Sequence, residues 1–276
     1  MLFYVVLILV LLAAYPMLIA PNRYRFAKNV QPLLNRDYAH RGLWNDERPE
    51  NSLSAFAAAR DAGYGVELDV HLTADGHLVV HHDNSLKRMC GKDIQIGSST
   101  MAEVTSCRLK GTDDLVPTFD DVLAVIGGKI PMIVELKTEN NVDALCKAVY
   151  ERMQRYEGVW CMESFDPLAV RWFRKNADHI IRGQLANGGS VLKAKPGKRW
   201  QLMMLKSQLG NALGRPDFIA YQAETDDNLP MRLIRRMKPL LVCWTIRSQE
   251  MMDRQRSRYD IQIFEGFIPR EPSPRS

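Results

Sequence analysis

The chain has 276 residues, of which 46% are hydrophobic and 25% are charged, a composition that provides a large core and excludes an intrinsically disordered protein. Its five cysteines contain no CxxC pair, which argues against a disulfide framework and a zinc knuckle and favours a reducing compartment. The formal net charge is +5, which is weak evidence for nucleic-acid binding unless the excess lies in one patch.

The first predicted element is an apolar helix. Residues 1–20 contain no charged side chain, and twenty residues at about 1.5 Å each cover the roughly 30 Å hydrocarbon core of a bilayer. The alternative, a cleaved signal peptide, lacks a basic segment before the apolar run and meets Pro21 after it. The sequence therefore predicts a transmembrane anchor over residues 1–21, with Pro16 as a tolerated kink.

A basic linker follows over residues 22–36. By the positive-inside rule, these charges predict a single-pass protein of the cell membrane whose remaining chain faces the cytoplasm. Basic residues beside a bilayer also gain roughly 1 kcal/mol each from anionic lipid headgroups. In the alternative interpretation they only keep the linker soluble, and the two are compatible. The basic residues are Arg23, Arg25, Lys28 and Arg36, with no acid before Asp37.

Residues 37–270 alternate short runs typical of strands with longer helical stretches, a pattern of parallel strands with crossover helices. Eight such units in about 235 residues predict one domain of the α/β class, a TIM (β/α)8 barrel. Helices are expected at 52–62, 143–155 and 167–176. Strands are expected at 38–40, 66–72, 130–136, 159–163, 180–185, 218–222, 240–246 and 261–264.

One segment departs from this alternation. Residues 66–80 read VELDVHLTADGHLVV, two alternating runs joined by Asp75-Gly76, which indicates a β-hairpin. Because a hairpin partner is antiparallel, we expect residues 78–82 to form a lip beside the barrel rather than a barrel strand. The lip lies at the carboxyl end of its strand, the face where TIM barrels carry their chemistry.

Three carboxylates are expected at neighbouring strand ends. Glu67 and Asp69 are two residues apart on one predicted strand and so share a face. Glu135 lies on the next predicted strand, within the apolar run 130–136. Each alone would more often be a salt-bridged acid. Together they suit a hard divalent ion such as magnesium or calcium.

Histidines lie on both sides of this acidic cluster. His40 ends the first predicted strand before Arg41, and His82 ends the lip before Asp83. Two histidines at the mouth suit a general base and a general acid, and an arginine suits a phosphate oxygen. Strand alternation sends His81 and His82 to opposite faces, and periodicity alone does not choose between them.

An ordered series of motifs resembles the glycerophosphodiester phosphodiesterase family, which are TIM-barrel phosphodiesterases like phosphatidylinositol phospholipase C. The resemblance spans roughly residues 37–265. Its motifs are HRG at 40–42, PENS at 49–52, the ExDVxxTxDGxxVVxHDxxLxR pattern at 67–88, ELK at 135–137, SFD at 164–166 and WT at 244–245.

The resemblance implies hydrolysis of a glycerophosphodiester to glycerol 3-phosphate and an alcohol, with a divalent metal ion on Glu67, Asp69 and Glu135. The metal, one histidine that activates the nucleophile and another that protonates the leaving alkoxide are consistent with phosphodiester chemistry. Either water or the glycerol hydroxyl of the substrate serves as nucleophile, and the sequence leaves both open.

The resemblance also implies the remaining roles. It implies that His40 and His82 transfer protons, which selects His82 over its neighbour. It also implies that Arg41 and Lys137 neutralise phosphate oxygens. Trp244 would line the glycerol end of the site.

The chain departs from the family pattern near its C-terminus. The family usually has an asparagine after the Trp-Thr pair and a Thr-Asp pair on the last strand, whereas this chain has Arg247 and Phe264-Glu265. Because both changes are expected at the barrel mouth, they bear on substrate choice more than on the reaction.

A second basic patch extends over residues 186–216, which contain no acid. Within it, residues 200–213 have apolar residues near helical spacing. The simpler interpretation is a crossover helix packed on the barrel. The sharper one, for residues 193–213, is an interfacial helix in contact with membrane lipids.

Three functions follow as hypotheses. The first is a membrane-anchored, metal-dependent glycerophosphodiester phosphodiesterase of lipid metabolism, acting on a small-molecule or lipid phosphodiester and not on nucleic acid. The second is a lysophospholipase D-type activity on membrane-derived glycerophospholipids. The third is a catalytically inactive, membrane-bound phosphate or lipid binder, against which the intact set of histidines and carboxylates argues.

Overall fold

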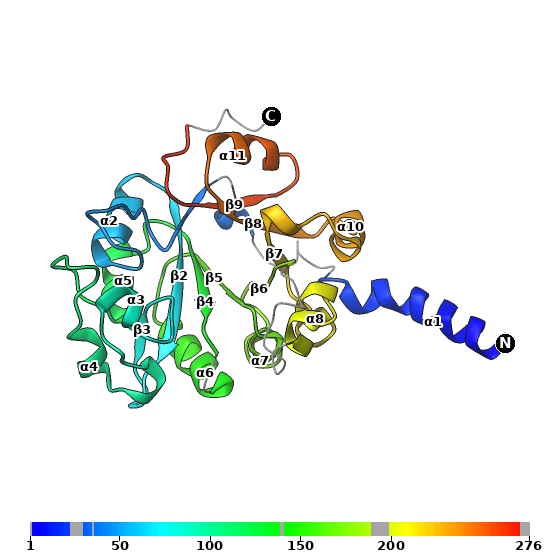
Figure 1. The fold of residues 1–276 in the computed structure, drawn as a ribbon, viewed down its shortest axis with the longest axis horizontal. Coiled ribbons are helices and arrows are strands. Elements are labelled where there is room, and N and C mark those ends of the chain that lie inside the picture. The colour runs from blue at the N-terminus through cyan, green and yellow to red at the C-terminus, as the bar shows by residue number, and fades with distance from the viewer. Residues whose placement is uncertain (1, 23–29, 35, 139–140, 189–198, 271–276) are drawn as a thin grey trace.

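The computed structural model describes residues 2–22, 30–34, 36–138, 141–188 and 199–270, and Figure 1 shows its fold. The predicted basic residues Arg23, Arg25 and Lys28 lie outside the described residues. So do Lys193, Lys195 and Lys198 of the second patch.

The described chain forms an eight-stranded parallel barrel, as the sequence predicts. The sheet order is β1-β9-β8-β7-β6-β5-β4-β2-β3, and an added β1–β2 pairing closes it. All eight expected strands are present, with ends that differ by a residue or two. The strands are β1 Tyr38–His40, β2 Gly65–Leu72, β3 Leu78–Val80, β4 Met132–Leu136, β5 Trp160–Ser164, β6 Arg182–Ala186, β7 Phe218–Gln222, β8 Leu240–Ile246 and β9 Ile261–Phe264.

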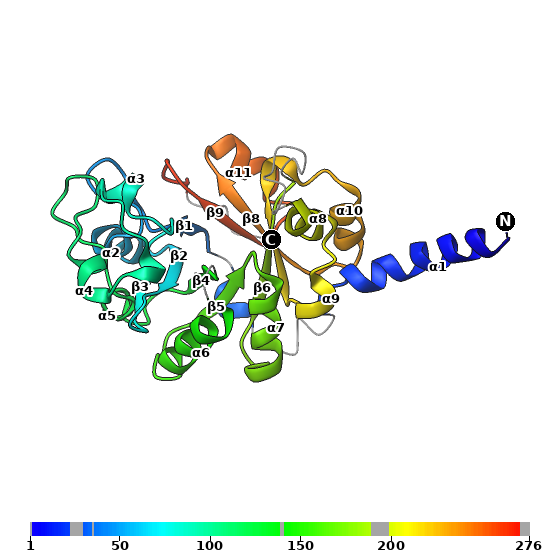
Figure 2. The same ribbon diagram turned by 60° about the horizontal axis from the view of Figure 1, so that its bottom comes forward.

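Helices surround the barrel (Figures 1 and 2). Local sequence sets several of their ends: the Ser52 side chain accepts a hydrogen bond from the Ala55 N–H, and Thr118 and Asp121 form a capping box. The helices are α1 Leu2–Ile19, α2 Leu53–Asp61, α3 Lys87–Cys90, α4 Met101–Thr105, α5 Phe119–Ile126, α6 Val142–Met153, α7 Pro167–Asn176, α8 Arg199–Ser207, α9 Asn211–Gly214, α10 Leu229–Arg236 and α11 Gln249–Gln255.

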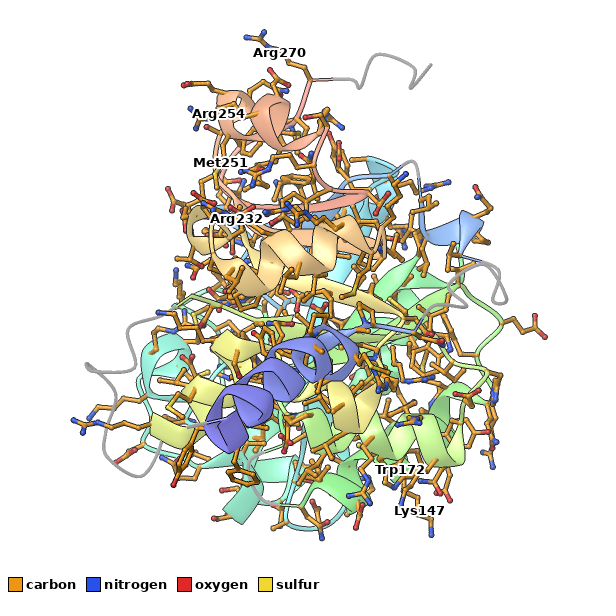
Figure 3. All side chains as sticks on the ribbon, turned by 90° about the vertical axis from the view of Figure 1, so that its right-hand side faces the viewer. Lys147, Trp172, Arg232, Met251, Arg254 and Arg270 are labelled. Atoms are coloured by element: carbon orange, nitrogen blue, oxygen red, sulfur yellow. The ribbon has the colours of Figure 1, made fainter. Side chains whose placement is uncertain are left out.

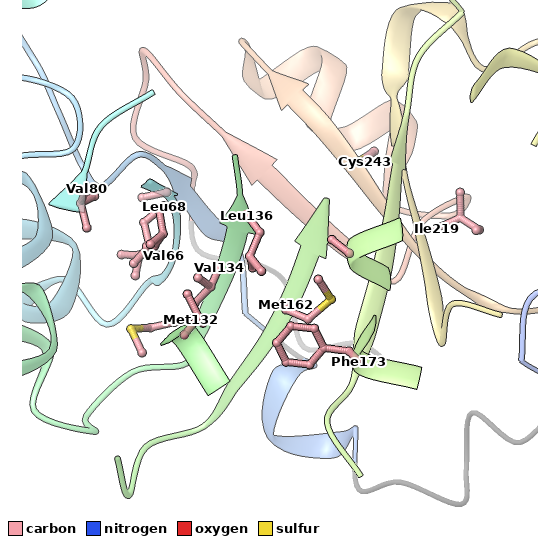
Figure 4. Close-up of a cluster of buried hydrophobic side chains, with 14 of the residues drawn as sticks. Val66, Leu68, Val80, Met132, Val134, Leu136, Met162, Phe173, Ile219 and Cys243 are labelled. Atoms are coloured by element: carbon pink, nitrogen blue, oxygen red, sulfur yellow. The ribbon is translucent and has the colours of Figure 1, made fainter. Parts of the chain in front are cut away.

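Strand alternation divides the core into two layers. Val66, Leu68 and Val134 belong to the larger cluster of apolar side chains, which also contains helix residues such as Phe173 (Figure 4). Ile133, between outward-facing neighbours, belongs to the smaller cluster with residues of several other strands. Since side chains alternate along a strand, the acids at positions 67, 69 and 135 face the barrel interior.

The predicted hairpin is confirmed. β3 pairs antiparallel with β2, with Val70 opposite Val80 and Leu72 opposite Leu78. Gly76 has φ +82° in the turn, a conformation that glycine adopts without a Cβ clash. Residues 83–116 then fold over the lip around a separate buried apolar cluster that includes Leu86, Ile96, Val104 and Val116.

The N-terminal apolar segment is helical, but the predicted membrane span is not confirmed. Among the described residues, no helix combines the length and the apolar character needed to cross a membrane. The end of α1 packs on the barrel: Ile19 is fully buried in the main core, and the Tyr15 hydroxyl donates to the Ser207 carbonyl oxygen at 2.8 Å.

The second basic patch is not one continuous helix. In its described part, α8 ends at Ser207 and α9 begins at Asn211, and Gln208 between them has φ +60°. A residue in the left-handed region interrupts the α-helical path, so the apolar spacing of residues 200–213 is shared between two helices.

Candidate active site

The predicted site residues gather at the carboxyl ends of the barrel strands, around a cavity of about 330 Å³. Several side chains in its wall belong to residues that the sequence singles out. The cavity-lining residues are His40, Arg41, Trp44, Glu50, Glu67, His82, Glu135, Glu163, Phe165, Leu185, Trp244, Thr245, Arg247, Ile263 and Glu265. Asp69 and Lys137 are not among them but contact the acidic residues of the wall.

Three carboxylates form a compact cluster beside this cavity. Glu67, Asp69 and Glu135 each offer an oxygen within 4.8 Å of the others, and their exposed fractions are 2%, 1% and 7%. The Lys137 ammonium bridges Asp69 at 2.8 Å and Glu135 at 2.7 Å. Three buried carboxylate oxygens at this spacing fit a hard divalent cation.

The three acids differ in their tendency to ionise. Burial raises the pKa of Glu67 well above its usual value, and the neighbouring carboxylates add to this effect. Burial also opposes ionisation of Asp69, but the charges of Lys137 and Arg41 hold its pKa well below its usual value. Burial raises the pKa of Glu135 to about 7 although Lys137 opposes the shift. Two of the three acids therefore need further positive charge to ionise fully at neutral pH.

The loop after β1 positions Arg41 against the cluster. Arg41 has φ +59°, and its backbone N–H donates to the Glu67 carbonyl oxygen at 3.0 Å. Its guanidinium donates to Glu50 at 2.9 Å and lies 3.5 Å from Asp69. The Asn51 amide donates at 2.8 Å to Oδ2 of Asp69, the same oxygen that faces the Arg41 guanidinium. The HRG and PENS motifs thus meet at one carboxylate.

His40 lies between two acids. Its Nδ1 is 2.6 Å from a carboxylate oxygen of Glu265, and its Nε2 is 3.8 Å from Glu67. Burial lowers the pKa of His40, and the hydrogen bond with Glu265 partly opposes this shift. A carboxylate at Nδ1 accepts the Nδ1–H proton and leaves Nε2 as the nitrogen that faces the acidic cluster.

His82 has its own carboxylate partner. Its Nδ1 is 2.7 Å from Asp83, whose second oxygen accepts from Arg88 Nε at 2.5 Å. Burial lowers the pKa of His82 to about 4, and the cations Lys137 and Arg41 add to this shift while Asp69 opposes it. The imidazole is therefore neutral at pH 7.

The two adjacent histidines point to different places. His82 lines the cavity and its side chain is 33% exposed, whereas His81 is 1% exposed and does not line it. The Nδ1 of His81 lies 2.8 Å from the Asp83 carbonyl oxygen. The geometry thus brings His82, rather than His81, to the cavity.

The opposite wall of the cavity is aromatic and apolar. Phe165 and Trp244 stack edge to face with ring centroids 5.7 Å apart, and Leu185 and Ile263 lie beside them in the same wall. Trp44 also lines the cavity, and the indole N–H groups of both tryptophans are buried without a hydrogen-bond partner in the described residues. Such donors suit oxygen atoms of a bound substrate.

Sequence reasoning missed two acids of the site. Glu163 is 1% exposed and pairs in register with Glu135, so both point inward from adjacent strands. The available signal was the position of this acid at the end of the predicted strand 159–163. Glu265 was noted only as a departure, yet it joins His40 to Arg247, whose Nε donates to it at 2.8 Å. Nothing in the sequence marks that pairing.

Comparisons with known proteins identify relatives of this chain. The family model described as the glycerophosphoryl diester phosphodiesterase family matches residues 40–260. A glycerophosphodiester phosphodiesterase of Caldanaerobacter subterraneus is 31% identical over 167 residues, which are 55% of this chain and 67% of that protein. Lysophospholipase D GDPD1 of Homo sapiens is 29% identical over 185 residues, 61% of this chain and 55% of that protein. The chain thus matches between half and two thirds of these relatives' length.

Solved structures share the fold. An Oleispira antarctica phosphodiesterase, in complex with the product sn-glycerol-3-phosphate, has a TM-score of 0.69 and 22% identity, and the match covers 85% of this chain and 94% of that one. A glycerophosphodiester phosphodiesterase of Thermotoga maritima has a TM-score of 0.63 and 23% identity, with 83% and 94% covered.

Proposed function

The chain belongs to the glycerophosphoryl diester phosphodiesterase family, and from this premise we propose that it hydrolyses glycerophosphodiesters to glycerol 3-phosphate and an alcohol. The observation that carries the proposal is one cavity that holds His40 and His82 together with two acids, Glu67 and Glu135, of the three-carboxylate cluster. A phosphodiester needs a base, an acid and positive charge at one place, and this cavity offers all three.

A divalent cation, magnesium or calcium, is part of the proposal. Glu67, Asp69 and Glu135 would hold it, since they offer three buried oxygens within 4.8 Å of one another. When bound, such an ion stabilises negative charge on the phosphoryl oxygens. Arg41 adds a fixed cation beside the cluster, because Glu50 and Asp69 hold its guanidinium from two sides.

We assign the two proton transfers to His40 and His82. Each has a carboxylate at Nδ1, Glu265 and Asp83 respectively, so each presents Nε2 as its free nitrogen. One enters the step neutral and takes the proton of the attacking oxygen at Nε2. The other must enter it protonated at Nε2, a form that the negative charge of a bound phosphodiester favours, and gives that proton to the leaving alkoxide. Lys137 would neutralise a phosphate oxygen, and Trp244 would line the glycerol end.

A direct assay tests the proposal. The purified full chain is incubated with glycerophosphoethanolamine and with Mg²⁺, Mn²⁺ or Ca²⁺, and release of glycerol 3-phosphate is measured. We expect turnover that EDTA abolishes and that added cation restores. No hydrolysis with any of the three cations would refute the proposal and leave the inactive phosphate or lipid binder as the better description.

A lysophospholipase D-type activity is the second candidate. The Homo sapiens, Rattus norvegicus and Mus musculus relatives carry that name, and the aromatic wall with Leu185 and Ile263 offers apolar contact beside the site. Glycerophosphoethanolamine and a lysophospholipid assayed side by side separate the two. Turnover of the lysophospholipid alone would reverse our ranking.

Membrane attachment through residues 1–36 and a cytoplasmic barrel complete the proposal. What supports them is an uncharged segment at residues 1–20 followed by basic residues through Arg36. Fractionation of cells that produce the full chain tests this part: recovery in the membrane fraction, resistant to a high-salt wash, is expected, and recovery in the supernatant would exclude it.

A further inference from the structure

We infer that one side of the barrel docks against an anionic lipid bilayer. This α8–α10 face consists of Arg199–Ser207, Asn211–Gly214 and Leu229–Arg236, with Met17 and Leu18 from the end of α1. Figure 3 views the molecule from the side on which α1 emerges. The inference rests on the proposed membrane attachment and extends it from the N-terminal segment to the folded barrel.

Exposed apolar side chains collect on this face. Met203 of α8 is 62% exposed, Leu213 of α9 38%, and Leu229 of α10 64%. At the end of α1, Met17 is 66% exposed and Leu18 is 41% exposed. The helices are neighbours, since α1 contacts both α9 and α10, and Tyr15 of α1 donates to the carbonyl oxygen of Ser207 at the end of α8. Single exposed apolar residues are ordinary, but a group on adjacent helices marks an interaction surface.

Basic residues accompany the apolar ones with helical periodicity. On both α8 and α10, one apolar and two basic side chains recur at three- and four-residue spacing, so they share the outer side of their helix. None of the described residues of α8, α9 or α10 is acidic. The outer side of α8 is Arg199, Met203 and Lys206, and that of α10 is Leu229, Arg232 and Arg236.

This mixture fits a bilayer surface. Apolar side chains of an interfacial helix enter the headgroup region while basic ones contact lipid phosphates. Lys206 and Arg236 have no ion pair among the described residues, whereas Arg232 pairs with the exposed Asp227 at 2.8 Å. An anionic membrane supplies the negative charge that the helices themselves lack.

The barrel also fixes where α1 leaves this face. The last carbonyl groups of a helix have no partner within it, and here barrel side chains cap them. Arg215 donates to the carbonyl oxygens of Met17 at 2.7 Å and Ala20 at 3.0 Å, and Asn211 donates to that of Ile19 at 2.8 Å. From this attachment α1 extends away from the barrel (Figures 1 and 2). A lipid surface that takes up α1 therefore meets the α8–α10 face.

Site-specific fluorescence tests the inference in the full chain. Cys90 is replaced by serine, because the other four cysteines are buried, and an NBD dye is placed on Met203→Cys or Leu229→Cys. The matched controls are Ile268→Cys and Leu115→Cys, at positions 65% and 45% exposed outside this face. Vesicles of phosphatidylcholine with one quarter phosphatidylglycerol should brighten the dye at the first two positions about twofold or more and leave the controls unchanged.

Charge reversal on α8 and α10 provides a second, independent test of the docking face. Lys206→Glu combined with Arg236→Glu should weaken vesicle binding about tenfold or more, because each basic residue near an anionic surface contributes roughly 1 kcal/mol. The matched control combines Lys129→Glu with Lys175→Glu, two exposed lysines outside the face, and should bind like the parent chain.

Co-sedimentation of the same samples separates the possible failures. A chain that sediments with vesicles while all four dyes respond alike, or none responds, would overturn the docking face and leave membrane attachment standing. A chain that does not sediment with vesicles would overturn both. Dyes at positions 203 and 229 that brighten with protein concentration alone would show that a second copy covers the face, which also overturns the inference.

Discussion

The two sides of the barrel mouth use different chemistry. The side built by β1, β2, β4 and β5 carries the four buried carboxylates Glu67, Asp69, Glu135 and Glu163 with their cationic partners. The side built by β6, β8 and β9, together with Phe165 just after β5, presents an aromatic and aliphatic wall. Charge is thus concentrated where a phosphate and a cation would bind, and apolar surface where the remainder of a substrate would lie.

His40 and Glu265 connect the two sides. His40 belongs to the charged side, but its Nδ1 partner comes from the end of β9, 225 residues later in the chain. Arg247 at the end of β8 holds the other oxygen of that carboxylate. The comparison teaches that the groups to which we assign the chemistry lie on the charged side, whereas the apolar side would contact the substrate and holds His40 in place through Glu265.

The largest expected effect is on the two histidines. His40→Ala and His82→Ala should each lower kcat by about a hundredfold or more, because a positioned general acid or base contributes that much. His77→Ala, an exposed histidine in the hairpin turn, is the matched control and should keep the parent rate. Steady-state assays with glycerophosphoethanolamine measure all three. Parental kcat in either active-site variant would remove that residue from the mechanism.

Removal of one carboxylate from the charged side should weaken cation binding. We expect Glu67→Gln to reduce the thermal stabilisation that Mg²⁺ or Ca²⁺ gives the purified chain, which for the parent is about 2.7 kcal/mol at a cation concentration of 100 Kd. Glu157→Gln, an exposed acid, should behave like the parent. Differential scanning fluorimetry across a cation titration measures the shift without any assay of activity. Equal shifts in Glu67→Gln and the parent would exclude this residue as a ligand.

The link between the two sides can be broken at Glu265. Burial lowers the pKa of His40 and the carboxylate of Glu265 raises it again in part, so Glu265→Gln should lower this pKa further. If His40 acts as the base, the acidic limb of the pH profile of kcat/KM then moves to lower pH, and kcat falls by about tenfold or more. The exposed Glu250→Gln on α11 is the control. An unchanged profile would reduce Glu265 to a structural partner.

Strand alternation explains how much of the fold the sequence predicts. Each of the eight strands is an apolar or alternating run that tertiary packing does not override, and the Asp75-Gly76 signal gives the antiparallel lip. The inward direction of Glu67, Asp69 and Glu135 follows from the same period of two. The helical break at Gln208 was not predictable, because the apolar spacing continues across it.

Contacts between distant segments explain what the sequence does not predict. Glu265 meets His40 only because the barrel closes β9 against β1, and the pairing of Glu163 with Glu135 needs the register of β4 and β5. The packing of Ile19 and Tyr15 on the barrel likewise needs the surfaces of α8 and α9. A hydropathy pattern contains no information about such partners.

The smallest effect on turnover is expected at His81, which the register places away from the cavity. His81→Ala should change kcat less than threefold, in contrast to about a hundredfold for its neighbour His82. It should instead destabilise the fold by about 1–3 kcal/mol, because the side chain is 1% exposed and its loss leaves a buried cavity and frees the Asp83 carbonyl oxygen. Urea unfolding measured beside the kinetics separates the two effects. A large loss of kcat with unchanged stability would mean that the chain after β3 is shifted by one residue, so that the charged side of the mouth uses the other histidine.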